Sequence, residues 1–182
     1  MTDGLPGSDT LPDKHCTISL IGMPGCGKSS VGVLLAKLTG LRFIDSDLDI
    51  QRREGATLQQ IIERSDYHYL RRVEEQVLLE LALDDAVLAT GGSAVYSAAA
   101  MQRLAAAGPL VYIEVQPELL RERIRRAPPR GIAGDPAQSF ADMFAERTAL
   151  YRRHATLTLD AGRDTPEDIA LRIQRRLGQT CP

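Results

Sequence analysis

Residues 22–29 have the sequence GMPGCGKS, which matches the pattern G-x-x-x-x-G-K-[ST] of a phosphate-binding loop. Glycines let such a loop curl so that its backbone N–H groups point at phosphate oxygens, and the following helix adds its positive end. Lys28 can reach the outer phosphates of a nucleotide, and the Ser29 hydroxyl is a hard oxygen ligand for Mg²⁺. The stretch therefore predicts a site that handles the terminal phosphates of ATP.

The residues on both sides of this loop fit the strand–loop–helix context that the motif requires. Residues 16–21 (CTISLI) form a short apolar, β-branched run, which is typical of a buried strand. After the loop, apolar residues at spacings 0, 3, 4 and 7 from Val31 form one stripe of a helix, which Gly40 ends. This context argues against the alternative, a glycine-rich turn without function.

Strands alternate with helices along the rest of the chain. The predicted strands are residues 16–21, 41–44, 86–89, 110–115 and 156–159; the predicted helices follow the loop and cover 48–82 (in two or three pieces broken near Gly55 and Ser65), 98–107, 117–126, 140–153 and 166–177. This alternation indicates an α/β fold, a five-stranded parallel sheet with helices on both faces. We therefore predict a three-layer P-loop kinase fold, with one domain at 15–182 after a flexible tail at 1–14.

Composition narrows the function further. A formal net charge of −2 over 182 residues gives no support for nucleic-acid binding, and no apolar run is long enough to span a membrane. The N-terminus lacks the features of a signal peptide. The three cysteines (Cys16, Cys26 and Cys181) form no CxxC pair, and fit a reducing compartment better than a disulfide framework or a zinc site. We expect a cytoplasmic monomer that acts on a small-molecule substrate.

Two further groups of residues follow predicted strands. Asp45 and Asp47 come after the second strand, where one carboxylate could lie near Mg²⁺ and the other near a substrate hydroxyl; the alternative is that they cap the next helix. Thr90-Gly91-Gly92 follows the third strand, where glycines let a backbone N–H approach a ligand, although a plain turn explains them equally well.

Three arginines are candidates for binding anionic groups. Arg130 lies in a segment rich in proline and glycine, residues 127–138, of the kind that closes as a lid over phosphates. Arg71 and Arg147 lie on predicted helices beside the site. Each could instead be an ordinary surface arginine, and Arg71 could pair with Glu75 one helical turn away.

Taken together, these motifs resemble those of the shikimate kinase family, within the nucleoside-monophosphate-kinase-like P-loop proteins. The resemblance runs from about residue 17 to residue 177, through LIGMPGCGKSSVGVLLAK, FIDSD, LRRVEEQVL, LATGGSAV, the arginine-bearing loop and ERTALYRR. It implies an enzyme that transfers a phosphoryl group from ATP to the 3-hydroxyl of shikimate, with Mg²⁺, on the route to chorismate and the aromatic amino acids.

The resemblance also implies roles for individual residues. For ATP these are Gly25, Cys26, Gly27, Lys28, Ser29 and Ser30, with Arg130 as the lid arginine and Arg163 near the adenine; Lys28, Asp47 and Arg130 are the catalytic candidates. Ser29 would bind Mg²⁺ directly and Asp45 through water. For the acceptor, Asp47 would bind hydroxyls and act as the base, while Arg71, Arg147 and the Gly91-Gly92 backbone would bind the carboxylate.

The chain departs from the family pattern at two places. The third glycine after the third strand is Ser93, whose side chain could narrow or re-polarise the acceptor pocket. The lid reads Arg130-Gly131-Ile132 where the family has Arg-Pro-Leu, and we expect Gly131 to loosen the lid, so that Gly131→Pro would strengthen closure wherever the backbone accepts proline. A kinase for another hydroxylated acid or a polyol remains the alternative, and a nucleotide-binding regulatory module a more distant one.

Overall fold

A computed structural model describes residues 16–128 and 131–178. The strands are β1 (Ile18–Ile21), β2 (Arg42–Asp45), β3 (Ala86–Ala89), β4 (Leu110–Glu114) and β5 (Leu157–Asp160). The helices are α1 (Lys28–Thr39), α2 (Ser46–Glu54), α3 (Leu58–Arg64), α4 (Tyr67–Glu80), η1 (Ala94–Tyr96, a 3₁₀ turn), α5 (Ala98–Ala107), α6 (Pro117–Arg126), α7 (Phe140–His154) and α8 (Pro166–Leu177). The five predicted strands are confirmed within two residues.

The five strands form one parallel sheet in the order β2-β3-β1-β4-β5. β1 lies at its centre, between β3 and β4, and all of its residues are buried. Parallel strands end at the same edge of a sheet, so the phosphate loop after β1 and the glycine turn after β3 are neighbours. The Thr90 hydroxyl fixes this arrangement by donating to the carbonyl of Leu20 at 3.0 Å.

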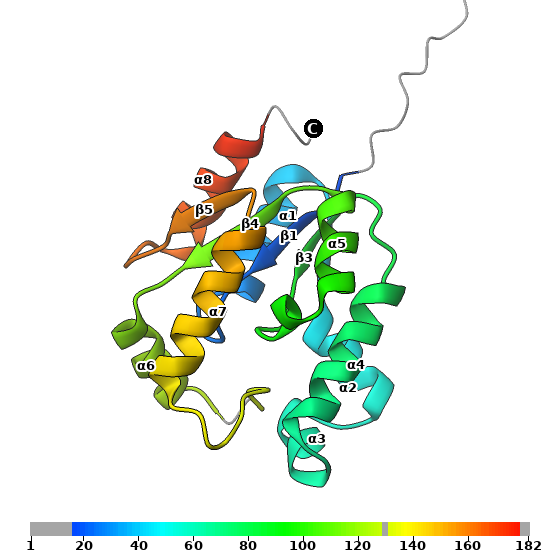
Figure 1. Ribbon diagram of the computed structural model, residues 1–182. Coiled ribbons are helices and arrows are strands. Elements are labelled where there is room, and N and C mark those ends of the chain that lie inside the picture. Colours follow the sequence, from blue (N-terminus) through cyan, green and yellow to red (C-terminus); the bar gives the residue numbers. More distant parts are fainter. Residues whose placement is uncertain (1–15, 129–130, 179–182) are drawn as a thin grey trace, which may run out of the picture.

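Helices cover both faces of the sheet, as the sequence predicts (Figure 1). α1 and α8 pack against each other on one face, while α5 and α7 lie on the other. Buried apolar side chains from both layers and the sheet form the main hydrophobic core. Gly40 ends α1 in the left-handed conformation, with a φ of 75°.

Helices α2, α3 and α4 form a smaller lobe beside the sheet (Figure 1). The helical stretch predicted over residues 48–82 is thus divided into three helices, with breaks at Gly55 and Ser65 as predicted. The lobe has its own apolar cluster, made of Ile50, Ile61, Leu70, Val73, Val77 and Ala133. Since Ala133 comes from the predicted lid segment, that segment is packed onto the lobe.

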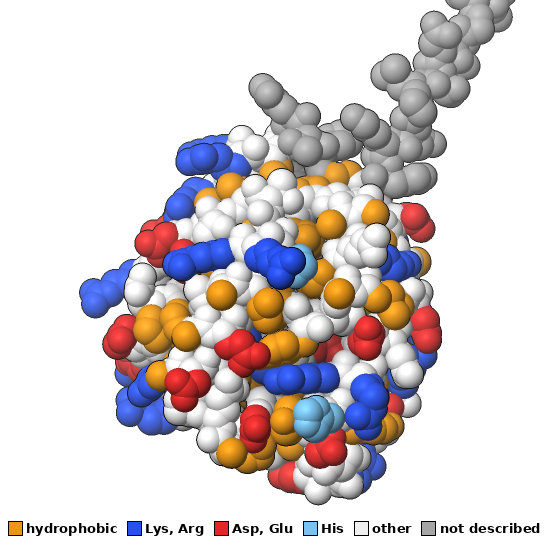
Figure 2. Space-filling model, in the orientation of Figure 1, with side chains coloured by type: hydrophobic (Ala, Val, Ile, Leu, Met, Phe, Trp, Pro, Cys, Tyr) orange, Lys and Arg blue, Asp and Glu red, His pale blue; other side chains and the backbone are white. Residues whose placement is uncertain are grey.

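Several sequence expectations concern positions outside the described residues, namely the tail at 1–14, Arg130 and Cys181. Cys26 is a free, buried thiol, whereas Cys16 is disulfide-bonded, which differs from the expectation that the cysteines stay unpaired. Within residues 16–128 and 131–178, no helix is long and apolar enough to cross a membrane. Acidic and basic side chains are interspersed over the face shown in Figure 2.

Candidate active site

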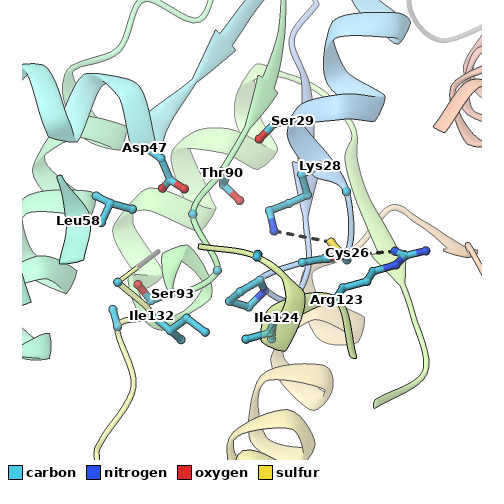
Figure 3. Close-up of a pocket in the computed structure, with 18 of the residues that line it drawn as sticks. Cys26, Lys28, Ser29, Asp47, Leu58, Thr90, Ser93, Arg123, Ile124 and Ile132 are labelled. Atoms are coloured by element: carbon cyan, nitrogen blue, oxygen red, sulfur yellow. Dashed lines mark hydrogen bonds between the residues drawn. The ribbon is translucent and has the colours of Figure 1, made fainter. Parts of the chain in front are cut away.

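A pocket of about 650 Å³ opens at the carboxyl edge of the sheet. The phosphate loop and the start of α1 form one wall, and Asp47, the Gly91-Gly92 turn and Arg147 form another. Residues 131–133 of the predicted lid lie across it. Figure 3 shows Lys28 and Asp47, from different elements, facing the same space. The structure therefore brings most of the predicted site residues into a single cavity.

Lys28 is the first residue of α1 and is only 8% exposed. Its Nζ donates to the carbonyl oxygens of Gly22 at 2.7 Å and Met23 at 3.0 Å, and lies 3.7 Å from the Cys26 Sγ. Ser29 and Ser30 are exposed and line the pocket at the N-terminus of the same helix. Backbone donors, a cation and two hydroxyls thus face one cavity, the arrangement that binds a polyphosphate.

Asp45 and Asp47 have different roles in the structure. Asp45 ends β2, and its Oδ1 accepts the Asp47 N–H at 3.1 Å, so the helix-capping alternative is confirmed for this residue. Asp47 lies in the first turn of α2 and lines the pocket. Of the two residues, only Asp47 lines the pocket.

The turn after β3 approaches the surrounding side chains so closely that it requires glycine. A Cβ on Gly91 would lie 2.9 Å from Asp47 Oδ1 and closer still to a carboxylate oxygen of Glu74. A Cβ on Gly92 would lie 2.8 Å from Pro24 and 3.2 Å from Nη1 of Arg147. Close packing on these side chains thus explains why both positions are glycine, and the Gly91 N–H donates to Ser46 Oγ at 3.0 Å. Binding of a ligand by the backbone of this turn stays a prediction.

Helix α7 presents Arg147 and Tyr151, four residues apart, to this turn. Both side chains are fully buried. The Tyr151 hydroxyl donates to the Gly92 carbonyl at 2.5 Å, which fixes the turn against the helix. Arg147 Nη1 is buried and has no hydrogen-bond partner among the described residues. A free donor of this kind beside Gly92 indicates a place for an acidic ligand oxygen.

Arg71 and Arg147 meet at one oxygen atom. Arg147 Nη2 donates to the Ala133 carbonyl at 2.6 Å, and Arg71 Nε donates to the same carbonyl at 3.2 Å. Both guanidinium groups lie over the ring of Tyr96, that of Arg147 at 5.4 Å and that of Arg71 at 3.9 Å from the ring centroid. Arg71 thus contacts the lid carbonyl, while Glu75 accepts a hydrogen bond from Ser97. Two arginines that converge on one oxygen suit a carboxylate.

The lid segment is held against α3 through Gly131. Its N–H donates to Gln59 Oε1 at 3.1 Å, and its φ is +63°. Proline is fixed near a φ of about −65°, so the condition for Gly131→Pro to strengthen closure is not met and that expectation is wrong. Glycine here allows close packing on the backbone of α3.

Gly131→Ala is expected to displace the lid from α3. A Cβ at this position would lie 2.5 Å from the Gln59 backbone nitrogen, in addition to the cost of its left-handed φ. We expect amide exchange in peptides covering residues 131–134 to become ~10-fold faster, equivalent to ~1.4 kcal/mol. Gly55→Ala is the matched control, because Gly55 has a φ of 61° and open space around it. Equal exchange in Gly131→Ala and wild type would show that the lid does not depend on this contact.

Glu74 is a buried carboxyl that sequence reasoning missed. It is 3% exposed and lines the pocket from α4. The pKa of Glu74 is raised to about 7, mainly because the carboxyl group is buried. The Asp47 charge also raises this pKa, while the Ser93 hydrogen bond, Arg147 and Lys28 lower it. The signal was in the sequence, because Glu74 falls on the apolar stripe of Leu70, Val73, Val77 and Leu78. A charged residue on a core-facing stripe is a candidate for a site.

The unfolding free energy is expected to fall with rising pH through Glu74. Its pKa in the folded state, about 7, exceeds the ordinary value of 4.5, so the folded state holds the proton more tightly. The stabilising free energy that the protonated Glu74 contributes is fully present below pH 4.5 and is lost as pH rises through 7. Between pH 5 and 8, wild type should lose roughly 2–3 kcal/mol relative to Glu74→Gln in urea unfolding. Parallel pH curves for the two proteins would contradict this.

The nucleotide end of the pocket contains residues that the sequence did not single out. Arg123 and Ile124 of α6, with Asp164 and Pro166 before and at the start of α8, line the cavity beside the phosphate loop. Arg123 Nη1 donates to the Gly25 carbonyl at 3.4 Å, as Figure 3 shows. Arg163, predicted near the adenine, is exposed and does not line this pocket, although its neighbour Asp164 does.

A phosphate loop between β1 and α1 of a five-stranded parallel sheet, with helices on both faces, defines the P-loop kinase class. The sequence model of the shikimate kinase family matches residues 24–178. The chain therefore belongs to the shikimate kinase family, whose members are kinases that transfer a phosphoryl group to an alcohol.

Individual relatives agree with this family. The chain is 38% identical to a shikimate kinase of Thiobacillus denitrificans over 84% of this chain and 85% of that protein. It is 37% identical to a shikimate kinase of Mycobacterium avium, over 88% and 93% of the two chains. The structure of shikimate kinase from Acinetobacter baumannii in complex with shikimate superposes with a TM-score of 0.81 at 32% identity, covering 93% of this chain and 97% of that one.

Proposed function

We propose that this protein transfers the γ-phosphoryl group of ATP to the 3-hydroxyl of shikimate, a step toward chorismate and the aromatic amino acids. The observation that carries the proposal is one cavity that is lined by the phosphate loop, Asp47 and Arg147. Arg71 lines a neighbouring pocket and meets Arg147 at the Ala133 carbonyl oxygen, which lies between the two arginines. Such a site suits an acceptor that carries both a carboxylate and hydroxyl groups.

The nucleotide binds at the phosphate loop in this proposal. Backbone N–H groups of residues 25–30 and the N-terminus of α1 hold the phosphates, and Lys28 turns from the loop carbonyls toward the transferring group. Arg123 and Ile124 border the space left for the base. Positioning and charge neutralisation supply most of the rate enhancement in phosphoryl transfer, and this arrangement provides both.

The acceptor binds between Asp47 and the two arginines. Asp47 accepts a hydrogen bond from the reacting hydroxyl and takes its proton, while Arg71 and Arg147 exchange the Ala133 carbonyl for the carboxylate. Residues 131–133 cover the cavity and exclude water, which would otherwise compete as an acceptor. Arg130, outside the described residues, remains the proposed lid arginine, and Arg130→Ala is expected to lower kcat far more than it weakens ATP binding.

Mg²⁺ is part of the proposal, with Ser29 as the protein ligand and Asp45 acting through water. No cluster of three acidic, histidine or cysteine side chains occurs among the described residues, which fits an ion held mainly by phosphate oxygens and water. Asp45 uses one oxygen to cap α2, which leaves its other oxygen for a water. When bound, Mg²⁺ neutralises charge on the phosphates. A cytoplasmic monomer remains part of the proposal as well.

A panel of acceptors tests the assignment. ADP release is followed with shikimate, other hydroxylated acids, polyols and no acceptor, and the product is identified by ³¹P NMR. We expect shikimate to give the highest kcat/KM and a 3-phosphate ester. A higher kcat/KM for another acid or a polyol would favour the related-kinase alternative. ATP binding without turnover of any acceptor would favour a nucleotide-binding regulatory module.

A further inference from the structure

A buried serine–glutamate pair lies in the wall of the pocket. Ser93 is 5% exposed and Glu74 is 3% exposed, and both line the cavity. The Ser93 hydroxyl donates a hydrogen bond to Glu74 Oε2. Figure 3 shows Ser93 beside Ile132 of the lid, on the same side of the cavity as Asp47. The pair thus joins the turn after β3 to helix α4 at the acceptor end of the site.

The second oxygen of Glu74 is left without a partner. Glu74 Oε1 is buried and accepts no hydrogen bond from the described residues. It lies against the Cα of Gly91, which is also approached by Asp47 Oδ1. A buried acceptor without a partner is costly, by about 1–3 kcal/mol. A ligand hydroxyl placed beside Asp47 would satisfy this oxygen.

Ser93 determines which oxygen of Glu74 is free. In the family pattern the corresponding residue is glycine, which has no hydroxyl to hold the carboxyl group. Ser93 directly precedes the η1 turn, but its side chain makes no capping hydrogen bond there and donates to Glu74 instead. The Ser93 hydroxyl therefore does not serve as the N-cap of η1.

We propose that Ser93 is a positioning residue for the acceptor: its hydroxyl holds one oxygen of Glu74 so that the other faces an acceptor hydroxyl beside Asp47. This inference deepens the proposed function and rests on it. Residue 93 then sets how strongly the enzyme discriminates between acceptors that differ in a hydroxyl other than the phosphorylated one. A site built to bind a hydroxyl rejects analogues that lack it, because its buried polar group is left unpaired.

A double-mutant cycle with Ser93→Ala, Glu74→Gln and the double variant tests the coupling. With shikimate, or with whichever acid wild type phosphorylates, Ser93→Ala should raise the acceptor KM about 5- to 10-fold, the size of one hydrogen bond. The kcat and the ATP KM should change less than about two-fold, since the contact is made in the ground state as well. In the Glu74→Gln background, Ser93→Ala should add little. Equal effects in both backgrounds would overturn the proposal.

Acceptor choice and ionisation give two further readouts. The preference of wild type for shikimate over 4-deoxy- or 5-deoxyshikimate should shrink in Ser93→Ala for one of the two analogues.

The pKa of Glu74, followed by ¹³C NMR of labelled glutamate, should rise in Ser93→Ala because the Ser93 hydrogen bond lowers it. Asp47, Arg147 and Lys28, the charged groups that face Glu74, are unchanged in this variant. An unchanged Glu74 titration would overturn the proposal whether or not shikimate is the acceptor.

Ser97→Ala is the matched control. The Ser97 hydroxyl donates to Glu75 Oε1 at 2.6 Å, so it joins the same two segments as Ser93 and Glu74 do, but outside the pocket. Ser97 also accepts the Ala100 N–H as the cap of α5, so the variant should lower the melting temperature without changing the acceptor KM. Ser93→Gly is measured in parallel in case Ser93→Ala folds poorly. An equal rise of the acceptor KM in Ser97→Ala would mean general loosening and overturn the proposal.

Discussion

Lys28→Ala is expected to lower kcat by at least about 100-fold, because a preorganised cation on the transferring phosphoryl group contributes several kcal/mol to transition-state stabilisation. Lys28 lies at the start of α1 with its Nζ on the loop carbonyls of Gly22 and Met23, from which it turns toward the transferring group in the proposed mechanism. Shikimate-dependent ADP release at saturating substrates measures the effect. Binding of an ATP analogue should weaken far less than kcat falls.

Lys37→Ala is the control for this experiment. Lys37 lies in the last turn of the same helix, is exposed and does not line the pocket. Its removal should cost a few tenths of a kcal/mol of helix stability and leave kcat unchanged. If Lys28→Ala retained more than about a tenth of wild-type kcat, the lysine would contribute less than ~1.4 kcal/mol and the kinase mechanism proposed for this site would be untenable.

The fold could be predicted closely because its signals are local. Strands β1 and β3 are short apolar runs bounded by glycine turns, and the phosphate loop fixes the order of strand, loop and helix. The breaks at Gly55 and Ser65 were also visible, because glycine ends a helix at low cost and serine favours the next turn. Each of these features depends on a few neighbouring residues.

The sequence predicted which residues form the site better than it predicted the contacts between them. Asp47, Gly91, Gly92 and Arg147 meet in one cavity, as expected, because they follow strand ends or lie on a flanking helix. The partners of Arg147 could not be predicted, since Tyr96 and Ala133 lie far from it in the sequence and carry no pattern of their own. Such contacts depend on how the lid segment and η1 pack against α7.

The outcomes at Gly131 and Asp45 have a common physical cause. Gly131 was judged from its entropy in the unfolded chain, whereas its role depends on a positive φ and a close approach to α3. The sequence left Asp45 open between a place near Mg²⁺ and a cap of the next helix, and the structure shows that it caps α2. In both cases the backbone conformation of one residue decides the outcome, and a sequence pattern averages over such conformations.

Arg147→Lys is expected to raise the shikimate KM about 10- to 100-fold while the ATP KM changes little. Lysine keeps the positive charge but loses the planar fork, and a hydrogen bond to a charged group is worth about 1.5–3 kcal/mol. Arg147 is fully buried, with Nη2 on the Ala133 carbonyl and Nη1 free beside Gly92, so two donors are poised for one carboxylate. Arg71→Lys should act in the same direction, because Arg71 shares that carbonyl.

We call the proposed binding of one carboxylate by Arg71 and Arg147 the arginine clamp. The methyl ester of shikimate tests whether the effect of Arg147→Lys comes from losing this clamp or from general damage to the pocket. Wild type should use the ester at least about 10-fold less efficiently than the acid, because esterification removes the charge that both arginines bind. In Arg147→Lys this preference should shrink, since part of the clamp is already lost. Arg152→Lys, on the same helix, is the control: Arg152 is 61% exposed, pairs with Glu114 and should leave both KM values unchanged. Equal turnover of acid and ester by wild type would contradict carboxylate binding by the two arginines and would favour a neutral polyol as the acceptor.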